Sequence, residues 1–157
     1  MKREDDIRAN VRENYGKVAL KLNSTQGCCT PATSCCNPND NQNISIEEIS
    51  QKMGYTKEEL ASIPDGANMG LSCGNPQAIA DLKPGEIVVD LGSGGGFDCF
   101  LAAPKVGKDG QVIGIDMTPE MISKARRNAE KPGFENVEFR LGEIEHMPVA
   151  DQTADYV

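Results

Sequence analysis

A glycine-rich turn after a short apolar run is the feature that most constrains how this chain folds. Residues 87–89 read Ile-Val-Val, Asp90 and Leu91 follow, and residues 92–96 read Gly-Ser-Gly-Gly-Gly before Phe97 begins an apolar segment. Residues without a Cβ let the backbone approach a ligand closely, and a strand that leads through such a turn into a helix is typical of α/β folds. The turn therefore predicts an α/β fold with a ligand site at this strand end.

The sequence after Gly85 alternates short apolar runs with helical segments, the pattern that builds a parallel sheet with crossover helices. Pro104 falls inside the first helical segment, where it is expected to kink the helix or end it early. Residues 155–157 look like the start of a fourth strand. The predicted strands are 86–91, 111–116 and 137–141, and the predicted helices between them are 97–106 and 119–130.

Apolar residues at helical spacing predict a first helix over residues 3–22. Residues 23–43 are rich in Asn and also hold Pro, Gly, Ser and Thr, so they predict a loop or a disordered insert, in which four cysteines lie. The apolar stripe of the first helix consists of Ile7, Val11, Tyr15, Val18 and Leu22.

Capping signals predict three further short helices. Asn75 as N-cap with Pro76 at the first helical position starts the last of them, which is expected to reach about Leu82. We therefore divide the chain into an N-terminal helical segment, 1–82, with the cysteine-rich loop, and a partial Rossmann-like domain, 83–157. The capping boxes of the other two helices are Ser45 with Glu48 and Thr56 with Glu59.

Length, apolar content and charge exclude several classes of protein. The chain has 157 residues, 38% of them apolar, which suffices for an ordinary hydrophobic core. Its apolar runs fall far short of the ~20 residues of a membrane-spanning helix, and its charged start has no apolar core of a secretory signal. Asp and Glu outnumber Lys and Arg by 24 to 16, so the chain lacks the basic footprint that nucleic acid requires. We expect a cytoplasmic protein that binds neither membrane nor nucleic acid.

Six cysteines in such a chain are metal ligands or reactive thiols, because a reducing compartment rarely keeps structural disulfides. Four form two adjacent pairs without the two- to four-residue gaps of zinc sites. Cys99 follows the glycine turn and is expected to be a packed thiol. His146, the single histidine, has no metal-spaced neighbour and is expected at the surface. The paired cysteines are Cys28, Cys29, Cys35 and Cys36.

Acidic residues near the ends of the predicted strands indicate the ligand. A dinucleotide site needs a third glycine where this chain has Phe97, which favours a ligand without phosphates. Asp90 can take an ammonium group, and Asp116 can accept both hydroxyls of a ribose. Glu143 either accepts from an adenine amino group or is a solvated acid, and Ile144 can cover the adenine ring. Together these positions point to S-adenosylmethionine.

Three of these motifs resemble those of the class I S-adenosylmethionine-dependent methyltransferases, and further motifs resemble the arsenite methyltransferase family. The general resemblance rests on residues 90–98, 113–117 and 142–145. The narrower one rests on Tyr15-Gly-Lys-Val-Ala19, the two cysteine pairs, and residues 63–76, 97–103 and 116–118. The resemblance covers nearly the whole chain and implies a Rossmann-like class I methyltransferase fold with N-terminal helices.

The resemblance implies that a methyl group passes from S-adenosylmethionine to trivalent arsenic, supplied as arsenite and held by cysteine thiolates. Cys73 takes the position of an arsenic-binding, catalytic cysteine. The paired cysteines carry arsenic to it, form a redox disulfide with it, or lie in a plain loop. A thiol reductant, thioredoxin or glutathione, is implied as cosubstrate. Leu71 stands where some relatives have Tyr, which removes an aromatic contact with the cofactor. The implied cofactor-binding residues are Asp90, Gly92, Ser93, Gly94, Asp116, Met117, Gly142, Glu143 and Ile144.

The resemblance also makes the chain look incomplete. A class I methyltransferase sheet has seven strands, whereas this sequence supplies three and the start of a fourth, and the family's further arsenic-binding cysteines fall beyond Val157. We expect a fragment that binds the cofactor weakly and methylates poorly or not at all. Its sheet edge, expected to be open and apolar, favours a homodimer through that edge.

Other functions stay open on the sequence. One is another class I methyltransferase that acts on carbon or oxygen of a small metabolite such as a quinone precursor. A second is a non-catalytic module that only binds the cofactor or a metalloid. A nicotinamide-dependent oxidoreductase is the least favoured, because Phe97 replaces the third fingerprint glycine.

Overall fold

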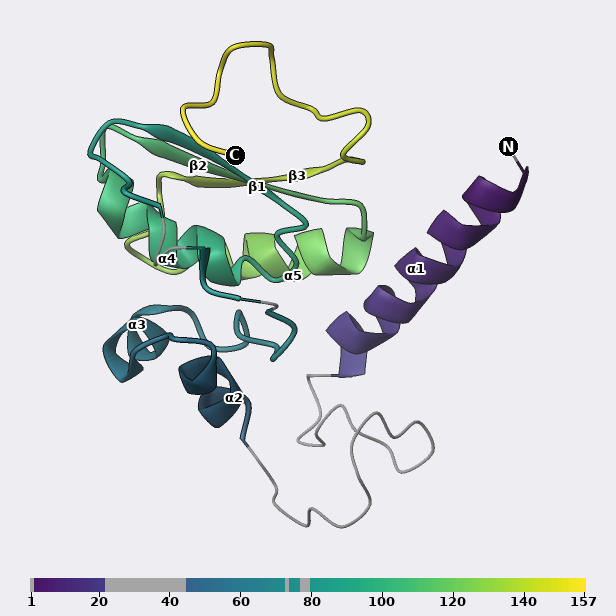
Figure 1. Ribbon diagram of the computed structural model, residues 1–157, viewed down its shortest axis with the longest axis horizontal. Coiled ribbons are helices and arrows are strands. Elements are labelled where there is room, and N and C mark those ends of the chain that lie inside the picture. The colour runs from purple at the N-terminus through teal and green to yellow at the C-terminus, as the bar shows by residue number, and fades with distance from the viewer. Residues whose placement is uncertain (1, 22–44, 73, 77–79) are drawn as a thin grey trace.

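Three parallel strands form a sheet, and two helices cover one of its faces (Figure 1). The computed structural model describes residues 2–21, 45–72, 74–76 and 80–157. The strands are β1 (Ile87–Leu91), β2 (Gln111–Asp116) and β3 (Val137–Leu141), in the order β1-β2-β3. The crossover helices are α4 (Phe97–Val106) and α5 (Pro119–Ala129). The α/β class is confirmed, and each of these five elements ends within one residue of its predicted bounds.

The segment after β3 returns to the side of β1 that β2 leaves free. The N–H of Val89 donates to the carbonyl of Tyr156 (2.9 Å), and the N–H of Asp155 donates to the carbonyl of Ile87 (2.8 Å). The bridge between Val88 and Tyr156 is parallel. β1 therefore has a partner on each side, as the predicted fourth strand requires, and part of the edge that was expected to be open is paired.

The core lies between the sheet and the helices α4 and α5. Phe100 and Val106 of α4 and Ile122 of α5 are at most 2% exposed. They pack in one cluster with Val112 of β2 and Phe139 of β3. Burial of each such side chain contributes about 1.5–3 kcal/mol, so this face of the sheet fixes how the strand ends are presented.

Pro104 does not end α4 early. The helix continues through it to Val106, and the N–H of Gly107 donates to the carbonyl of Ala103 (3.1 Å). A proline has no N–H and so removes one helical hydrogen bond. Pro104 lies in the last turn of α4, where few helical hydrogen bonds follow it.

Gly96 and Gly114 make room for the ring of Phe139. At Gly96 the φ angle is +89°, a backbone conformation that L side chains rarely adopt. A Cβ there would lie 2.5 Å from Cζ of Phe139 and 2.7 Å from Cε2 of Phe100. A Cβ on Gly114 would lie 2.6 Å from Cδ1 of Phe139. The glycine turn therefore packs directly on the aromatic core.

Two short helices precede the sheet and begin at the predicted capping boxes. They are α2 (Ile46–Lys52) and α3 (Lys57–Ser62). Ser45 Oγ accepts from the N–H of Glu48 (3.1 Å), whose carboxylate accepts from the N–H of Ser45 (2.9 Å). Thr56 and Glu59 make the same reciprocal pair. Each box satisfies N–H groups that a helix start leaves without partners.

The predicted helix from Pro76 to Leu82 is wrong at its end. Residues 80–83 have no regular structure, and residues 77–79 lie outside the described part of the chain. The ring of a proline disfavours the helical conformation of the residue that precedes it. Lys83 precedes Pro84 and accepts from the N–H of Glu86 in a turn that leads into β1.

The first helix is α1 (Lys2–Lys21). Two residues of its apolar stripe, Val11 and Tyr15, line a cavity rather than a packed core. Gly16 and Ala19 are its buried residues, whereas Tyr15 stays 47% exposed. A Cβ on Gly16 would lie 3.0 Å from the carboxylate of Glu120 in α5. This close approach seats α1 against α5, beside the carboxyl ends of the strands.

Tyr55, between α2 and α3, connects these helices to α4. Its hydroxyl lies 2.8 Å from Oδ1 of Asp98 and 2.6 Å from the carbonyl oxygen of Gly74. The phenol has one proton, so it donates to only one of these two acceptors at a time. The pKa of Asp98 is raised to about 6, mainly because the carboxyl is buried. The hydrogen bond from Tyr55 lowers this pKa, and the negative charge of Asp90 raises it.

We predict that Gly96→Ala lowers the free energy of unfolding by about 2–4 kcal/mol in a denaturant titration, because the methyl group meets two aromatic rings on a backbone with positive φ. Gly133→Ala is the matched control, since its φ is +99° but no atom lies within 4 Å of the added Cβ. Its loss should be about 1–2 kcal/mol, from the backbone alone. Equal losses in the two variants would show that contact with Phe139 does not matter.

We also predict that Asp98 makes stability depend on pH. Because its pKa is raised from 3.8 to about 6, the folded chain holds this proton more tightly than the unfolded chain. The contribution of Asp98 is therefore largest below pH 3.8 and is lost as the pH rises through 6. Asp98→Asn keeps a donor without the charge, so its stability relative to wild type should rise by about 2–3 kcal/mol between pH 4 and pH 7. A difference that stays constant over this range would contradict the assignment.

Candidate functional site

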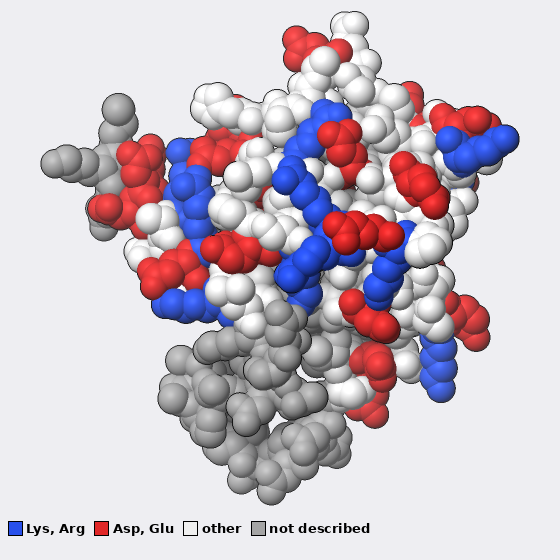
Figure 2. Space-filling model, turned by 180° about the vertical axis from the view of Figure 1, so that it is seen from behind, with Lys and Arg blue, Asp and Glu red and all other residues white. Residues whose placement is uncertain are grey.

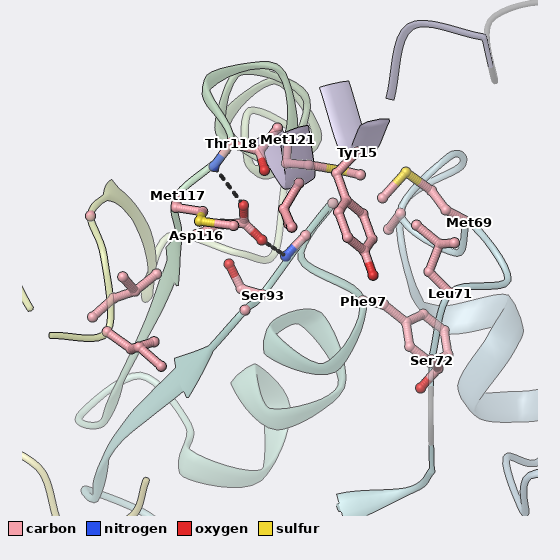
Figure 3. A pocket seen from close by; sticks show the side chains of 18 of the residues that line it. Tyr15, Met69, Leu71, Ser72, Ser93, Phe97, Asp116, Met117, Thr118 and Met121 are labelled. Atoms are coloured by element: carbon pink, nitrogen blue, oxygen red, sulfur yellow. Dashed lines mark hydrogen bonds between the residues drawn. The ribbon is translucent and has the colours of Figure 1, made fainter. Parts of the chain in front are cut away.

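A cavity of about 400 Å³ opens at the carboxyl ends of the strands. Its walls come from α1, the segment 67–72, the glycine turn after β1, the end of β2 and the loop after β3 (Figure 3). Open α/β sheets bind their ligands at this end. Of the nine cofactor-binding residues named from the sequence, all but Asp90 line it. These eight are Gly92, Ser93, Gly94, Asp116, Met117, Gly142, Glu143 and Ile144.

Asp116 holds the glycine turn and the start of α5 together. Its Oδ2 accepts from the N–H of Gly94 (3.0 Å), and its Oδ1 accepts from the N–H of Thr118 (2.7 Å), as the dashed lines in Figure 3 mark. An ionised carboxylate has about four acceptor positions. Each oxygen thus keeps capacity for one further donor, which matches the predicted bidentate contact with two hydroxyls.

Ser93 brings an unpartnered hydroxyl to the cavity wall. The residue is 7% exposed, and its Oγ is buried and makes no hydrogen bond within the described part of the chain. A buried hydroxyl without a partner costs about 1–3 kcal/mol. The N–H groups of Gly92 and Ser93 both donate to the carbonyl of Ile115 (2.8 and 3.0 Å), which fixes the turn that carries this hydroxyl. Ser93 thus lines the cavity and carries a hydroxyl that none of the described residues satisfies.

Asp90 does not line the cavity. Its Oδ2 accepts from the thiol of Cys99 (3.2 Å). Burial raises the pKa of Asp90, the hydrogen bond from Cys99 lowers it, and the charge of Asp116 raises it. Cys99 is 0% exposed, which confirms the predicted packed thiol. Burial and the charge of Asp90 raise the pKa of Cys99, so the thiol remains a protonated donor. The sequence did not indicate this pair.

The loop after β3 is joined to α1 by ion pairs. Glu143 pairs with Arg12, and Arg8 lies 3.8 Å from Glu143 and 2.8 Å from Glu145. Glu143 was expected to be an adenine acceptor or a solvated acid, and its contact with Arg12 adds a third role. His146 in the same loop is exposed, as predicted.

Side chains from outside the Rossmann-like part complete the cavity. Figure 3 shows the ring of Tyr15 reaching from α1 into the space between Asp116 and Leu71. The helical spacing identified Tyr15 as part of a stripe, but it carried no information on what that stripe faces. Cavity residues that were not assigned from the sequence include Val11, Tyr15, Asn68, Met69, Ser72 and Phe97.

The arsenic-binding residues expected from the sequence lie outside the described residues, and so does the loop 23–43. These residues are Cys28, Cys29, Cys35, Cys36 and Cys73. Leu71 and Ser72, directly before Cys73, line the cavity. Among residues 2–21, 45–72, 74–76 and 80–157, no group of three or more His, Cys, Asp or Glu side chains can hold a metal ion. None of the described helices is long and apolar enough to cross a membrane.

The charged side chains do not form a basic patch on the face shown in Figure 2. Lys and Arg alternate there with Asp and Glu. On this face acidic side chains lie beside the basic ones that run down its middle (Figure 2).

Comparison with known proteins agrees with the motifs and the cavity. A family model described as a methyltransferase domain matches residues 82–157. An arsenite methyltransferase of Halobacterium salinarum is 49% identical over 164 residues, covering 98% of this chain and 39% of that protein. An arsenite methyltransferase of Aquipseudomonas alcaligenes is 44% identical, covering 94% of this chain and 40% of that protein.

Among solved structures, a SAM-dependent methyltransferase from Aquifex aeolicus is 27% identical, with a TM-score of 0.49 over 71% of this chain and 54% of that chain. The present chain spans about two fifths of the length of the two arsenite methyltransferases. The resemblance found in the motifs is thus confirmed as a similarity to arsenite methyltransferases over nearly the whole of this chain, with a methyltransferase-domain match over residues 82–157.

Proposed function

We propose that this chain is part of a cytoplasmic, S-adenosylmethionine-dependent enzyme that methylates trivalent arsenic. The observation that carries the proposal is that Ser93, whose hydroxyl has no partner among the described residues, and the Asp116 carboxylate line the same cavity, at the strand ends where such folds bind ligands. The homology to arsenite methyltransferases supports the choice of substrate. Residues 83–157 form the cofactor part, and residues 1–82 add the substrate side.

The cavity suits a nucleoside with a sulfonium side chain. Its volume of about 400 Å³ lies within the range of small-molecule sites. Asp116 would accept the ribose hydroxyls, and Met117 and Ile144 would flank the adenine. Glu143 would accept from the adenine amino group beside its ion pair with Arg12. The glycine turn, with the Ser93 hydroxyl, would hold the methionine part.

Asp90 takes an electrostatic role in this arrangement. Asp90 lies outside the cavity lining, and its Oδ2 accepts a hydrogen bond from the thiol of Cys99. Its negative charge favours the ammonium group of the cofactor without direct contact. This differs from the direct contact that the motif implied.

Cys73 is the proposed catalytic ligand of arsenic. Trivalent arsenic is soft, so thiolates displace its hydroxides and leave its lone pair free. When bound, the cofactor supplies an electrophilic methyl group for that lone pair. Leu71 and Ser72 line the cavity just before Cys73 in the chain, which favours a site next to the cofactor. Because the lone pair would form the bond to the methyl carbon, arsenic would become pentavalent, and a thiol reductant, thioredoxin or glutathione, would return it to the trivalent state. The paired cysteines would carry arsenic to Cys73 or form a disulfide with it.

We predict that Asp116→Asn raises the Kd for S-adenosylmethionine about 10- to 100-fold in a calorimetric titration. The reason is that a hydrogen bond to a charged group contributes about 1.5–3 kcal/mol. Asp151→Asn, a change of the same kind in an exposed turn, should leave the Kd unaltered. Tighter binding of NAD than of S-adenosylmethionine by the wild-type chain would refute the cofactor assignment.

We predict that Cys73→Ser reduces the yield of methylated arsenic from arsenite, S-adenosylmethionine and a thiol reductant by about 100-fold, because a hydroxyl does not hold a soft centre in line with the methyl group. Ser123→Ala is the control, since Ser123 is exposed and does not line the cavity. If the wild-type chain forms no product, arsenite binding in equilibrium dialysis is the readout. Equal arsenite binding or turnover by Cys73→Ser and wild type would favour a metabolite methyltransferase instead.

A further inference from the structure

Tyr15 of α1 brings an aromatic ring to the cavity from outside the Rossmann-like part of the chain. The residue lines the cavity, and its side chain is 47% exposed. The faces of an aromatic ring carry negative charge density and attract cations. The cavity therefore has on this side a group that a positively charged ligand can use.

The packing of α1 directs this ring toward the cavity. Ala19, one helical turn after Tyr15, is buried in a cluster with Met69 and Met121, and both methionines line the cavity. Val11, one turn before Tyr15, lines the cavity as well. Residues four apart lie on the same side of a helix. The contacts of its neighbours on this stripe thus hold Tyr15 at the cavity wall.

Figure 3 indicates which part of the cofactor the ring would meet. There the ring of Tyr15 lies between Asp116 and Leu71, whereas Met117 lies on the far side of Asp116. In the arrangement proposed above, Met117 flanks the adenine and Asp116 accepts the ribose hydroxyls. The sulfur follows the ribose in the cofactor, so the sulfonium end extends from Asp116 toward Tyr15.

The acids of the described cavity lining already have partners. Asp116 accepts from two backbone N–H groups, and Glu143 pairs with Arg12. The aromatic residues of that lining are Tyr15 and Phe97, and Tyr15 is much the more exposed of the two. The ring of Tyr15 is therefore the group best placed to stabilise a positive charge at the sulfonium end.

We propose that Tyr15 is a further cofactor-binding residue, whose ring face takes the sulfonium group and so favours the charged methyl donor over its product. This rests on the proposed cofactor. When the methyl group passes to the lone pair of arsenic, the electron pair of the broken C–S bond stays on sulfur, which becomes a neutral thioether. The product, S-adenosylhomocysteine, then lacks the attraction of the ring. Tyr15 thereby favours replacement of the product by a new methyl donor.

The test is Tyr15→Leu, which removes the ring and keeps an apolar residue of high helix propensity. We expect the Kd for S-adenosylmethionine in a calorimetric titration to rise about 3- to 10-fold, in keeping with a partly exposed cation–π contact. S-adenosylhomocysteine and 5′-methylthioadenosine both have a neutral sulfur, so their Kd values should stay within about twofold of wild type.

Two further variants serve as controls. Tyr15→Phe keeps the ring and removes the hydroxyl, so its Kd for S-adenosylmethionine should stay within about twofold of wild type. Leu20→Ala changes an exposed residue of the same helix outside the cavity lining, and it should alter none of the three affinities. Tyr15 and Leu20 are both exposed, so none of these variants removes a core side chain, and all should fold.

The outcomes separate this inference from the proposed function. If wild type binds neither S-adenosylmethionine nor S-adenosylhomocysteine, the proposed function fails at its cofactor. If wild type binds S-adenosylmethionine and Tyr15→Leu binds it equally well, the role of Tyr15 alone is wrong. Equal losses for all three ligands in Tyr15→Leu would show that the ring contacts the nucleoside or only supports the wall, which overturns the inference. A loss in Tyr15→Phe as large as in Tyr15→Leu would assign the contact to the hydroxyl and overturn it as well.

Discussion

The shared hydrogen bonding of Asp116 is the interaction on which the site depends. One carboxylate accepts from Gly94 after β1 and from Thr118 at the start of α5, so two loops that follow different strands become one wall. Parallel pairing of β1 with β2 brings both loops to the same edge. Phe139 fits below the turn only because Gly96 and Gly114 lack side chains. Without this packing, the glycine turn that carries Ser93 would not be held at the cavity wall.

The N-terminal segment closes the cavity by electrostatic and steric means. Arg8 and Arg12 of α1 pair with acids of the loop after β3, at sites partly open to solvent. Exposed ion pairs of this kind contribute little energy individually. The position of α1 therefore depends more on the close approach of Gly16 to Glu120 and on the packing of Ala19 against Met69 and Met121. This leaves the helix in place while it allows Tyr15 to reach the cavity.

Local signals predicted the strands, the crossover helices and the capped helices well, because each depends on nearby residues. The Ser45 and Thr56 caps are two such cases. The exit from the Pro76 helix depends on the turn at Pro84, and the partner of Glu143 lies on α1, 131 residues away. The contact between Asp90 and Cys99 needs the strand and helix to be packed before it exists. Spacing along the chain does not encode such contacts between distant elements.

The two halves of the proposed reaction are held by different structural means. The cofactor wall consists of strand ends and backbone N–H groups, which a parallel sheet supplies wherever a glycine turn follows a strand. The described residues of the substrate turn, Leu71, Ser72 and Gly74, belong to no strand or helix. The hydrogen bonds of this turn run instead to the connection between α2 and α3, which itself packs on Phe97 at the edge of the cofactor wall.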